Sequence, residues 1–497
     1  MKSKLRIVYA GLVLALFSGA LFGCRRDVGG ASAPLFSATP TPDSEAPGTA
    51  ATAVVDTPTP TPTRTPPETT AIYHTIRAGE TLSAIAVAYG TTVESLMRLN
   101  GMTNADQLAV GQVIQVSMDA QHIGPDAHLI PDSELVYGPA YTDFDVAAAT
   151  AAFPGMFNGY AEDVEGRTMT GPEIVQLVAE QYSVGPRVLL ALLELRGGWL
   201  TNPDPPPDKR VYPLGYARDY WDGLYSQLNL AANALDAGFY GWWLDTLWLI
   251  QTDDGAYIQF SLKLNAGTAG VQRALASGAA DYDAWTAELA RFATVYRDLF
   301  GDPFTHTTGP MIPVDMASPE LDLPWAVGET WYYTGGPHPG WGTLGAWSAL
   351  DFTTGERNIG CMTSQGWVTA AAPGQVLVSQ NGMVLQDLDG DGFLGSGWVL
   401  LYMHMASEGR VAAGTFLNTG DPVGHPSCEG GVSDAAHLHF ARRYNGIWIA
   451  ADDARWPMSL SGWVPASAGD AYDGTIAKGD QVRTACECWE AVNAIQH

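Results

Sequence analysis

The chain has 497 residues, too many for a single hydrophobic core, so we expect about two to four domains. Lysine and arginine number 25 against 53 acidic residues, which gives a formal net charge of -28. Nucleic-acid phosphates require a basic footprint, so this composition excludes nucleic acid as the expected partner.

Residues 1–24 have the features of a bacterial export signal. A basic start precedes the apolar run 7–22, and Leu21-Phe22-Gly23-Cys24 resembles a lipobox. The resemblance implies a lipoprotein with Cys24 as the lipid acceptor, and a plain transmembrane anchor is the alternative. In either case we expect an extracytoplasmic protein tethered to the membrane at the cell envelope.

Residues 25–71 are rich in proline, threonine, serine and alanine, with Thr57-Pro58-Thr59-Pro60-Thr61-Pro62 at their centre. This segment has too few apolar side chains to offset the entropy lost on ordering, and proline favours extended conformers. We therefore predict a disordered spacer.

Residues 72–118 read as strand, helix, helix, strand. Tyr73-His74-Thr75-Ile76 alternates, two short helical stripes follow, and Gly111-Gln112-Val113-Ile114 returns as a strand. The pattern resembles a LysM module almost throughout, which implies binding to the glycan of peptidoglycan. By this resemblance the groove residues are Gly79, Glu80, Thr81, Leu82, Leu99, Asn100 and Leu108; for Leu82 and Leu99, a purely structural role in the core is the alternative.

Residues 140–308 are mainly helical in pattern, with predicted helices over 172–181, 186–195, 224–237 and 282–300. The run 184–193 and the Asn-Ala-Gly turn at 265–267 resemble lytic transglycosylases of lysozyme-like fold. That family's catalytic glutamate position holds Arg196 here, and Glu194 lies about 200° around the helix from it. We predict a degenerate glycan-binding or spacer domain.

From residue 310 onward, short alternating runs replace helical ones. Strands are expected over 368–371, 374–378, 383–386 and 398–403, which predicts an antiparallel β domain over 320–455, followed by an extension over 456–497 with a Cys-x-Cys motif. Asp387, Asp389 and Asp391 match the start of a calcium loop, but position 12 is a tryptophan. A calcium site and a solvated hairpin tip both remain open.

The histidines of this β domain suggest a metal site. Alternation along a strand places His437 and His439 on one face, while His404 ends one apolar run and Asp351 lies within another. Several imidazoles and a carboxylate on separate strands can supply the three protein ligands of a catalytic zinc.

Leu350-Asp351-Phe352, Tyr402-Met403-His404 and His437-Leu438-His439-Phe440 resemble, in this order, the lysostaphin-type (LytM-like) zinc endopeptidases, which cut peptidoglycan cross-bridges. The resemblance makes Asp351 and His439 zinc ligands, His437 a base acting on water and His404 a group that stabilises the oxyanion. The segment Gly335-Gly336-Pro337-His338-Pro339 resembles that family's His-Pro loop.

The family's first ligand position, four residues before the aspartate, holds Trp347. An indole nitrogen is a donor only and cannot bind a metal. Two readings follow. Either His338 or His425 replaces the missing ligand, with His338 the preferred candidate, or the domain is catalytically inactive and binds peptidoglycan or activates another wall hydrolase.

Four cysteines remain after Cys24, and in an oxidising exterior they can form two disulfides, for which we predict the pairs Cys361–Cys428 and Cys486–Cys488. Taken together, the sequence predicts a multidomain α+β lipoprotein that binds peptidoglycan and hydrolyses its peptide cross-links with zinc.

Overall fold

The computed structural model describes residues 73–77, 79–89, 91, 93–116, 120–357 and 359–497. The predicted signal, the lipid acceptor Cys24 and the spacer up to residue 71 lie outside these residues. Within them, no helix combines the length and apolar character needed to span a membrane.

The predicted LysM module has the expected order of elements. These are β1 (Tyr73–Thr75), α1 (Leu82–Ala88), α2 (Val93–Leu99) and β2 (Val113–Gln115), and β1 pairs antiparallel with β2. Thr81 caps α1, because its hydroxyl oxygen accepts the N–H of Ala84 at 3.1 Å. The buried core of the module consists of Ile76, Leu82, Ile85, Ala86, Leu96, Ile114 and Val116.

The middle region is mainly helical, as predicted. Its helices are α3 (Asp132–Leu135), α4 (Val146–Thr150), α5 (Gly171–Tyr182), α6 (Pro186–Gly197), α7 (Pro207–Val211), α8 (Leu224–Trp243), α9 (Ala266–Ala276) and α10 (Tyr282–Phe300), with 3-10 turns η1 (Pro139–Tyr141), η2 (Met156–Gly159) and η3 (Pro303–His306). Its short strands are β3 (His122–Ile123), β4 (Ala161–Val164), β5 (Arg167–Thr170), β6 (Leu249–Gln251) and β7 (Tyr257–Gln259).

Helix α8 continues six residues beyond the predicted end at residue 237. Gly238 lies inside it and allows a close crossing with α9, because a Cβ at this position would come within 2.5 Å of the carbonyl oxygen of Ala269. The glycine therefore serves helix packing and does not end the helix.

Residues 330–496 form the antiparallel β domain. Its strands are β8 (Thr330–His338), β9 (Ala349–Thr353), β10 (Val368–Thr369), β11 (Gly374–Gln380), β12 (Met383–Asp387), β13 (Trp398–Met403), β14 (Phe416–Leu417), β15 (Pro422–Gly424), β16 (Leu438–Tyr444), β17 (Ile447–Trp448), β18 (Val464–Ser467), β19 (Gly474–Lys478), β20 (Gln481–Thr484) and β21 (Ala494–Gln496).

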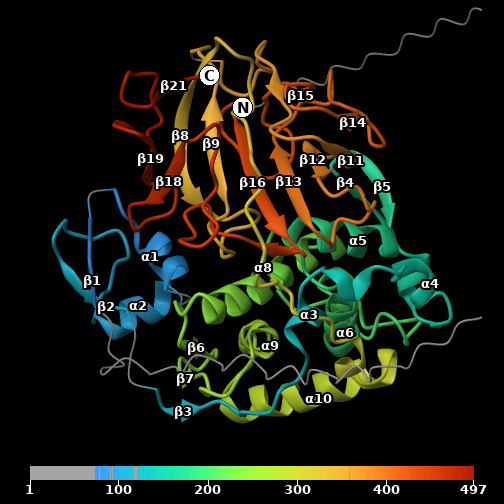
Figure 1. Ribbon diagram of the computed structural model, residues 1–497. Coiled ribbons are helices and arrows are strands. Elements are labelled where there is room, and N and C mark those ends of the chain that lie inside the picture. The colour runs from blue at the N-terminus through green and yellow to red at the C-terminus, as the bar shows by residue number, and fades with distance from the viewer. Residues whose placement is uncertain (1–72, 78, 90, 92, 117–119, 358) are drawn as a thin grey trace, which may run out of the picture. The chain divides into compact units, whose positions relative to one another are not determined.

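Nine of these strands form the main sheet, in the order β14-β11-β12-β13-β16-β9-β8-β21, with β17 paired to β16 (Figure 1). The C-terminal extension contributes β21 at one edge and the separate three-stranded sheet β18-β19-β20. The segment at 335–339, expected to be a loop, is instead the bulged end of β8, whose register against β9 shifts around Gly335.

Both faces of the main sheet are covered, and this decides where the site lies. Along β13, Val399, Leu401 and Met403 belong to a core shared with the helices, whereas Leu400 and Tyr402 belong to a second core on the opposite face. Along β9 and β16, Leu350, Phe352, Leu438 and Phe440 also face the second core. Asp351 and His439 alternate with them and therefore lie on the face that the helices cover.

Candidate metal centre

Three neighbouring strands bring together a carboxylate and two imidazoles. Asp351 on β9 pairs directly with His439 on β16 and with Gly335 on β8, whose last residue is His338. Glycine is required at 335, because a Cβ there would come within 2.5 Å of Asp351 Oδ2. The bulged end of β8 thus lets His338 approach from the other side of the aspartate.

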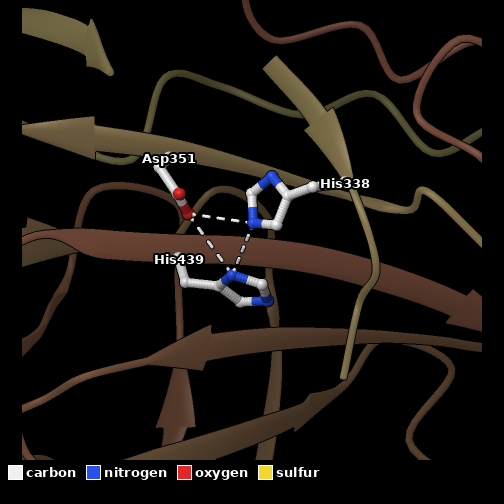
Figure 2. A group of neighbouring side chains, drawn as sticks. All are labelled: His338, Asp351 and His439. Carbon is white, nitrogen blue, oxygen red and sulfur yellow. Dashed lines mark hydrogen bonds and ion pairs between the residues drawn. The ribbon is translucent and has the colours of Figure 1, made fainter. Parts of the chain in front are cut away.

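Figure 2 shows the three side chains pointing at one another. His338 Nε2 lies 2.9 Å from His439 Nδ1, and Asp351 Oδ1 lies 3.2 Å from the former and 3.3 Å from the latter. His338 and Asp351 are buried, and the side chain of His439 is 12% exposed.

The hydrogen bonds on the far side of each ring fix which nitrogen carries the proton. His338 Nδ1 lies 2.7 Å from the carbonyl oxygen of Gly336, and His439 Nε2 lies 3.0 Å from that of Gly340. A carbonyl oxygen only accepts, so these two nitrogens donate. In the neutral rings, His338 Nε2 and His439 Nδ1 therefore present lone pairs to the same point.

This donor set fits a metal cation. Two imidazole lone pairs and a carboxylate oxygen that makes no hydrogen bond within the described residues face one another in a buried site, and such groups repel unless a cation lies between them. Burial alone would raise the pKa of the Asp351 carboxyl, but positive charge on the adjacent histidines, His338 first, would hold that pKa well below its ordinary value. Backbone carbonyls that orient ligating histidines are typical of metal sites.

Two further histidines border this group. His437 Nε2 lies 3.7 Å from Asp351 Oδ1, so both histidines of the His-x-His motif face the aspartate. The His404 ring centre lies 4.5 Å from that of His437. His404 follows β13 with a φ of 66°, a left-handed conformation that is uncommon outside glycine and often marks functional sites.

Both of these rings carry their proton on Nδ1. His404 Nδ1 donates to the carbonyl oxygen of Glu429 at 3.2 Å, and His437 Nδ1 donates to that of Ala435 at 2.8 Å. Each neutral ring therefore keeps a lone pair on Nε2. Burial, with the neighbouring His437 and His439, lowers the pKa of His404 to about 3, so this ring is neutral at physiological pH.

Tyr472 also belongs to the group, and no sequence pattern indicated it. Its ring stacks on His338 with centres 4.1 Å apart, and its carbonyl oxygen accepts the N–H of Gly336 at 2.6 Å. The residue is 52% exposed and has a φ of 70°. Burial of its hydroxyl and the charge of Asp351 raise the pKa of Tyr472 to about 12.

The two alternatives for the third ligand are separated by position. His338 lies in the group with Asp351 and His439, whereas His425 Nδ1 donates to the carbonyl oxygen of Gly366 and the ring packs on Trp367, outside the group. The backbone carbonyl of Trp347 accepts the N–H of Ala451. The family spacing places the first ligand four residues before Asp351, at Trp347. In this structure the candidate for that ligand is His338, thirteen residues before Asp351 on the preceding strand.

The sulfur atoms of Cys361 and Cys428 lie 2.07 Å apart, and those of Cys486 and Cys488 lie 1.93 Å apart, in the predicted pairing. The first pair joins the segment around Gly360 to the one that leads into His437, and Ala436 donates its N–H to the carbonyl of Gly360. This bridge braces the rim of the candidate site.

Asp387, Asp389 and Asp391 form a second cluster, in a turn of the β domain. Asp387 is buried at the end of β12, and its two carboxylate oxygens accept backbone N–H groups of Asp389, Gly390 and Gly392. Asp391 accepts from the Phe393 N–H and the Ser396 hydroxyl. The turn itself therefore supplies partners for its carboxylates.

The predicted glycan-groove residues divide into exposed and structural positions. Gly79 and Thr81 are exposed, and Glu80, Leu99 and Leu108 are half-buried. Leu82 is a core residue, as the structural alternative held. The Asn100 amide bonds the backbone of Leu96 and Gln115 and so joins α2 to β2.

Glu194 of the middle region is hydrogen-bonded within the protein. Its carboxylate accepts the N–H groups of Leu200 and Thr201 and the hydroxyl of Thr201. These bonds use both carboxylate oxygens of Glu194 to close the turn after α6.

Comparison with known protein families identifies two regions. Residues 74–117 match the LysM domain, and residues 128–314 match "LasA, N-terminal domain". Among curated proteins, Protease LasA of Pseudomonas aeruginosa (strain UCBPP-PA14) is 29% identical over 297 residues, which cover 55% of this chain and 66% of LasA. This chain is thus similar to the LasA proteases and carries a LysM domain. It spans just under two thirds of the length of the LasA sequences that it matches.

A second curated relative, the N-acetylmuramoyl-L-alanine amidase XlyA of Bacillus subtilis (strain 168), is 32% identical over 120 residues, 22% of this chain and 39% of the amidase. Solved structures similar to this LasA relative include the M23 metalloprotease pseudoalterin, with 24% identity, a TM-score of 0.28 and coverage of 34% of this chain and 96% of that one. The catalytic domain of lysostaphin from Staphylococcus simulans has 25% identity, a TM-score of 0.18 and coverage of 25% and 89%. The predicted LysM module is confirmed, and so is the predicted resemblance to a peptidase, since the chain is similar to Protease LasA.

Proposed function

We propose that this protein is a zinc-dependent endopeptidase that hydrolyses peptide bonds in peptidoglycan, with the LysM module holding it on the glycan. The observation that carries the proposal is the convergence of three lone-pair donors, His338 Nε2, Asp351 Oδ1 and His439 Nδ1, on one buried point. Two nitrogens and one carboxylate oxygen form the ligand set of many catalytic zinc sites, which keep a fourth position open.

In this proposal His338, Asp351 and His439 hold the zinc, which when bound polarises the scissile carbonyl and lowers the pKa of a water to about 7. His437 offers a proton-free Nε2 that can accept the proton of the attacking water, whereas His404, with a pKa of about 3, is too weak a base for that step. The oxyanion role first assigned to His404 requires an Nε2–H, which its neutral tautomer does not carry, because Nδ1 donates to Glu429.

The substrate class rests on the relatives and on the module. The curated relatives are a protease and an amidase whose name specifies N-acetylmuramoyl-L-alanine, so both break amide bonds. The LysM module supplies a peptidoglycan-binding element on the same chain. Cleavage of amide bonds and binding to peptidoglycan together indicate an amide bond in the peptide portion of the wall as the substrate.

We further propose that the protein is exported and lipid-anchored through Cys24, as the lipobox-like segment suggests. Cys361–Cys428 and Cys486–Cys488 would be disulfides in that oxidising compartment. Labelling with a fatty-acid analogue in bacteria, compared with a Cys24→Ser variant, tests the anchor.

The function is tested by metal analysis and cleavage of cross-linked muropeptides by the purified chain. We expect about one zinc per chain, the count for a single three-ligand catalytic site, release of new amino termini, and loss of both in Asp351→Ala. A chain that holds no zinc and leaves muropeptides intact, but still sediments with peptidoglycan, would show a wall-binding protein without peptidase activity.

A further inference from the structure

The segment directly after His338 supports the metal site from outside. Residues 339–347, called the support loop here, lead from β8 to β9. The carbonyl oxygen of Gly340 in this loop accepts the proton of His439 Nε2 at 3.0 Å and so directs Nδ1 toward Asp351. The position of Gly340 therefore determines how one proposed ligand is oriented.

Gly340 is held by a tryptophan that the helical region anchors. The Trp448 ring packs on it so closely that a Cβ at 340 would come within 2.7 Å of that ring. The indole N–H of Trp448 donates to the carbonyl of Tyr182 at the end of α5 (3.1 Å), and its backbone N–H donates to the Tyr240 hydroxyl on α8 (2.9 Å). The tryptophan is buried and thus links two helices to the carbonyl that orients His439.

The tip of the support loop is fixed by the same helices. The Asn233 side chain on α8 accepts the backbone N–H of Thr343 at 2.9 Å and donates to the Thr343 hydroxyl at 3.0 Å. Gly342 lies against both Asn233 and Tyr182, where a Cβ would come within 2.6 and 2.7 Å of them. The Trp341 ring meets Tyr182 edge to face, with centres 6.3 Å apart.

We infer that the helical region is a structural part of the metal site. Its residues Asn233 and Tyr182, together with Trp448 of β17, are positioning residues that hold the support loop and thereby the orientation of His439. This inference rests on the proposed zinc site, and it replaces the predicted role of the region as a spacer or glycan binder. Outer contacts of ligating histidines typically contribute 10–100-fold to metal affinity. Asn233 acts on that contact only through the support loop, so we expect its loss to weaken zinc binding by about fivefold, less than the loss of a direct outer contact.

The test uses the full chain and a matched pair of variants on one helix. Asn233→Ala removes both bonds to Thr343, whereas Asn229→Ala, one turn earlier on α8, removes an amide that bonds the Tyr225 carbonyl of the same helix. Asn233→Asp is the rescue variant, because a carboxylate accepts the Thr343 N–H and the Thr343 hydroxyl can turn to donate. Zinc affinity is measured against a competing chelator, and hydrogen exchange is measured at the Gly340 amide, which donates to the Ala346 carbonyl.

We expect Asn233→Ala to weaken zinc binding about fivefold and to speed exchange at Gly340, Asn229→Ala to change neither, and Asn233→Asp to restore both. Equal zinc affinity in the two alanine variants overturns the inference, even if exchange at Gly340 rises, because the loop would then move without affecting His439. If the parent chain takes up no zinc, the proposed function fails first. Even in a parent chain without zinc, hydrogen exchange at the Gly340 amide tests whether Asn233 holds the support loop. Unchanged exchange in Asn233→Ala would show that it does not.

Discussion

The β domain carries two clusters of candidate metal ligands, and they differ in what satisfies their lone pairs. His338, Asp351 and His439 come from three strands, and the ring nitrogens that do not face the cluster are bonded to backbone carbonyls, so the remaining lone pairs converge. Asp387, Asp389 and Asp391 come from one turn, whose own N–H groups already bind their carboxylates.

The difference shows that proximity of acidic or imidazole groups is insufficient evidence for a metal. In the strand cluster the described residues turn acceptors toward one point and provide no hydrogen-bond donor to Asp351 Oδ1, which leaves a cation as the missing partner. In the turn cluster the protein provides donors, which makes the turn self-sufficient as an ordinary hairpin tip.

The largest effect is expected from His338→Ala. The variant removes one of three donors, so zinc affinity should fall by more than the roughly 10–100-fold typical of an outer contact, and muropeptide cleavage should be lost. His425→Ala is the matched control, because that histidine lies in a neighbouring loop outside the group. Equal zinc loss in both variants, measured by chelator competition, would contradict the assignment.

Tyr472 offers a smaller effect that separates ring from hydroxyl. The stacked ring restrains His338, so Tyr472→Ala should weaken zinc binding by about tenfold, the low end for contacts that orient a ligand, whereas Tyr472→Phe should keep the parent affinity. Cleavage rates measured at saturating zinc then report any role of the hydroxyl. Parent-like zinc affinity in Tyr472→Ala would show that the stack does not position His338.

Trp347→His tests whether the strand cluster is complete. A histidine four residues before Asp351 recreates the ligand spacing of the lysostaphin type, but His338 already supplies the third donor. We expect zinc stoichiometry and affinity to stay at the parent values in equilibrium metal analysis. Zinc uptake by the variant from a parent that holds none would mean that the site was incomplete without position 347.

Much of the fold could be predicted because its signals are local. Period-two runs predicted β12 and β13, period-3.6 runs predicted α5, α6 and α10, and the alternation of His437 and His439 placed both rings toward Asp351. Each of these features depends on residues that are close in sequence, so the local sequence pattern is enough to predict it.

The parts that could not be predicted depend on contacts between distant segments. His338 reaches the metal-ligand position because β8 bulges around Gly335. That bulge is defined by the pairing of β8 with β9, so the sequence of β8 alone does not reveal it. Tyr472 reaches the site from the C-terminal extension through a left-handed turn, for which its neighbours in sequence give no signal. The extension of α8 past Gly238 likewise follows from packing against α9.

The smallest expected effect concerns the turn cluster. Burial and the neighbouring Asp387 raise the pKa of Asp389 from 3.8 to about 6. The folded state therefore binds a proton more tightly than the unfolded state between these values, and the stability gained from that proton is lost as pH rises through about 6. Asp389→Asn removes this ionisation, so in chelator-treated protein it should raise the Tm at pH 7 by about 1–2 °C, as for a mostly exposed group, and have no effect near pH 4. A lower Tm in the variant at pH 7, together with a calcium-dependent rise in Tm seen only in the parent, would show that the turn holds a cation after all, and the contrast between the two clusters would then fail.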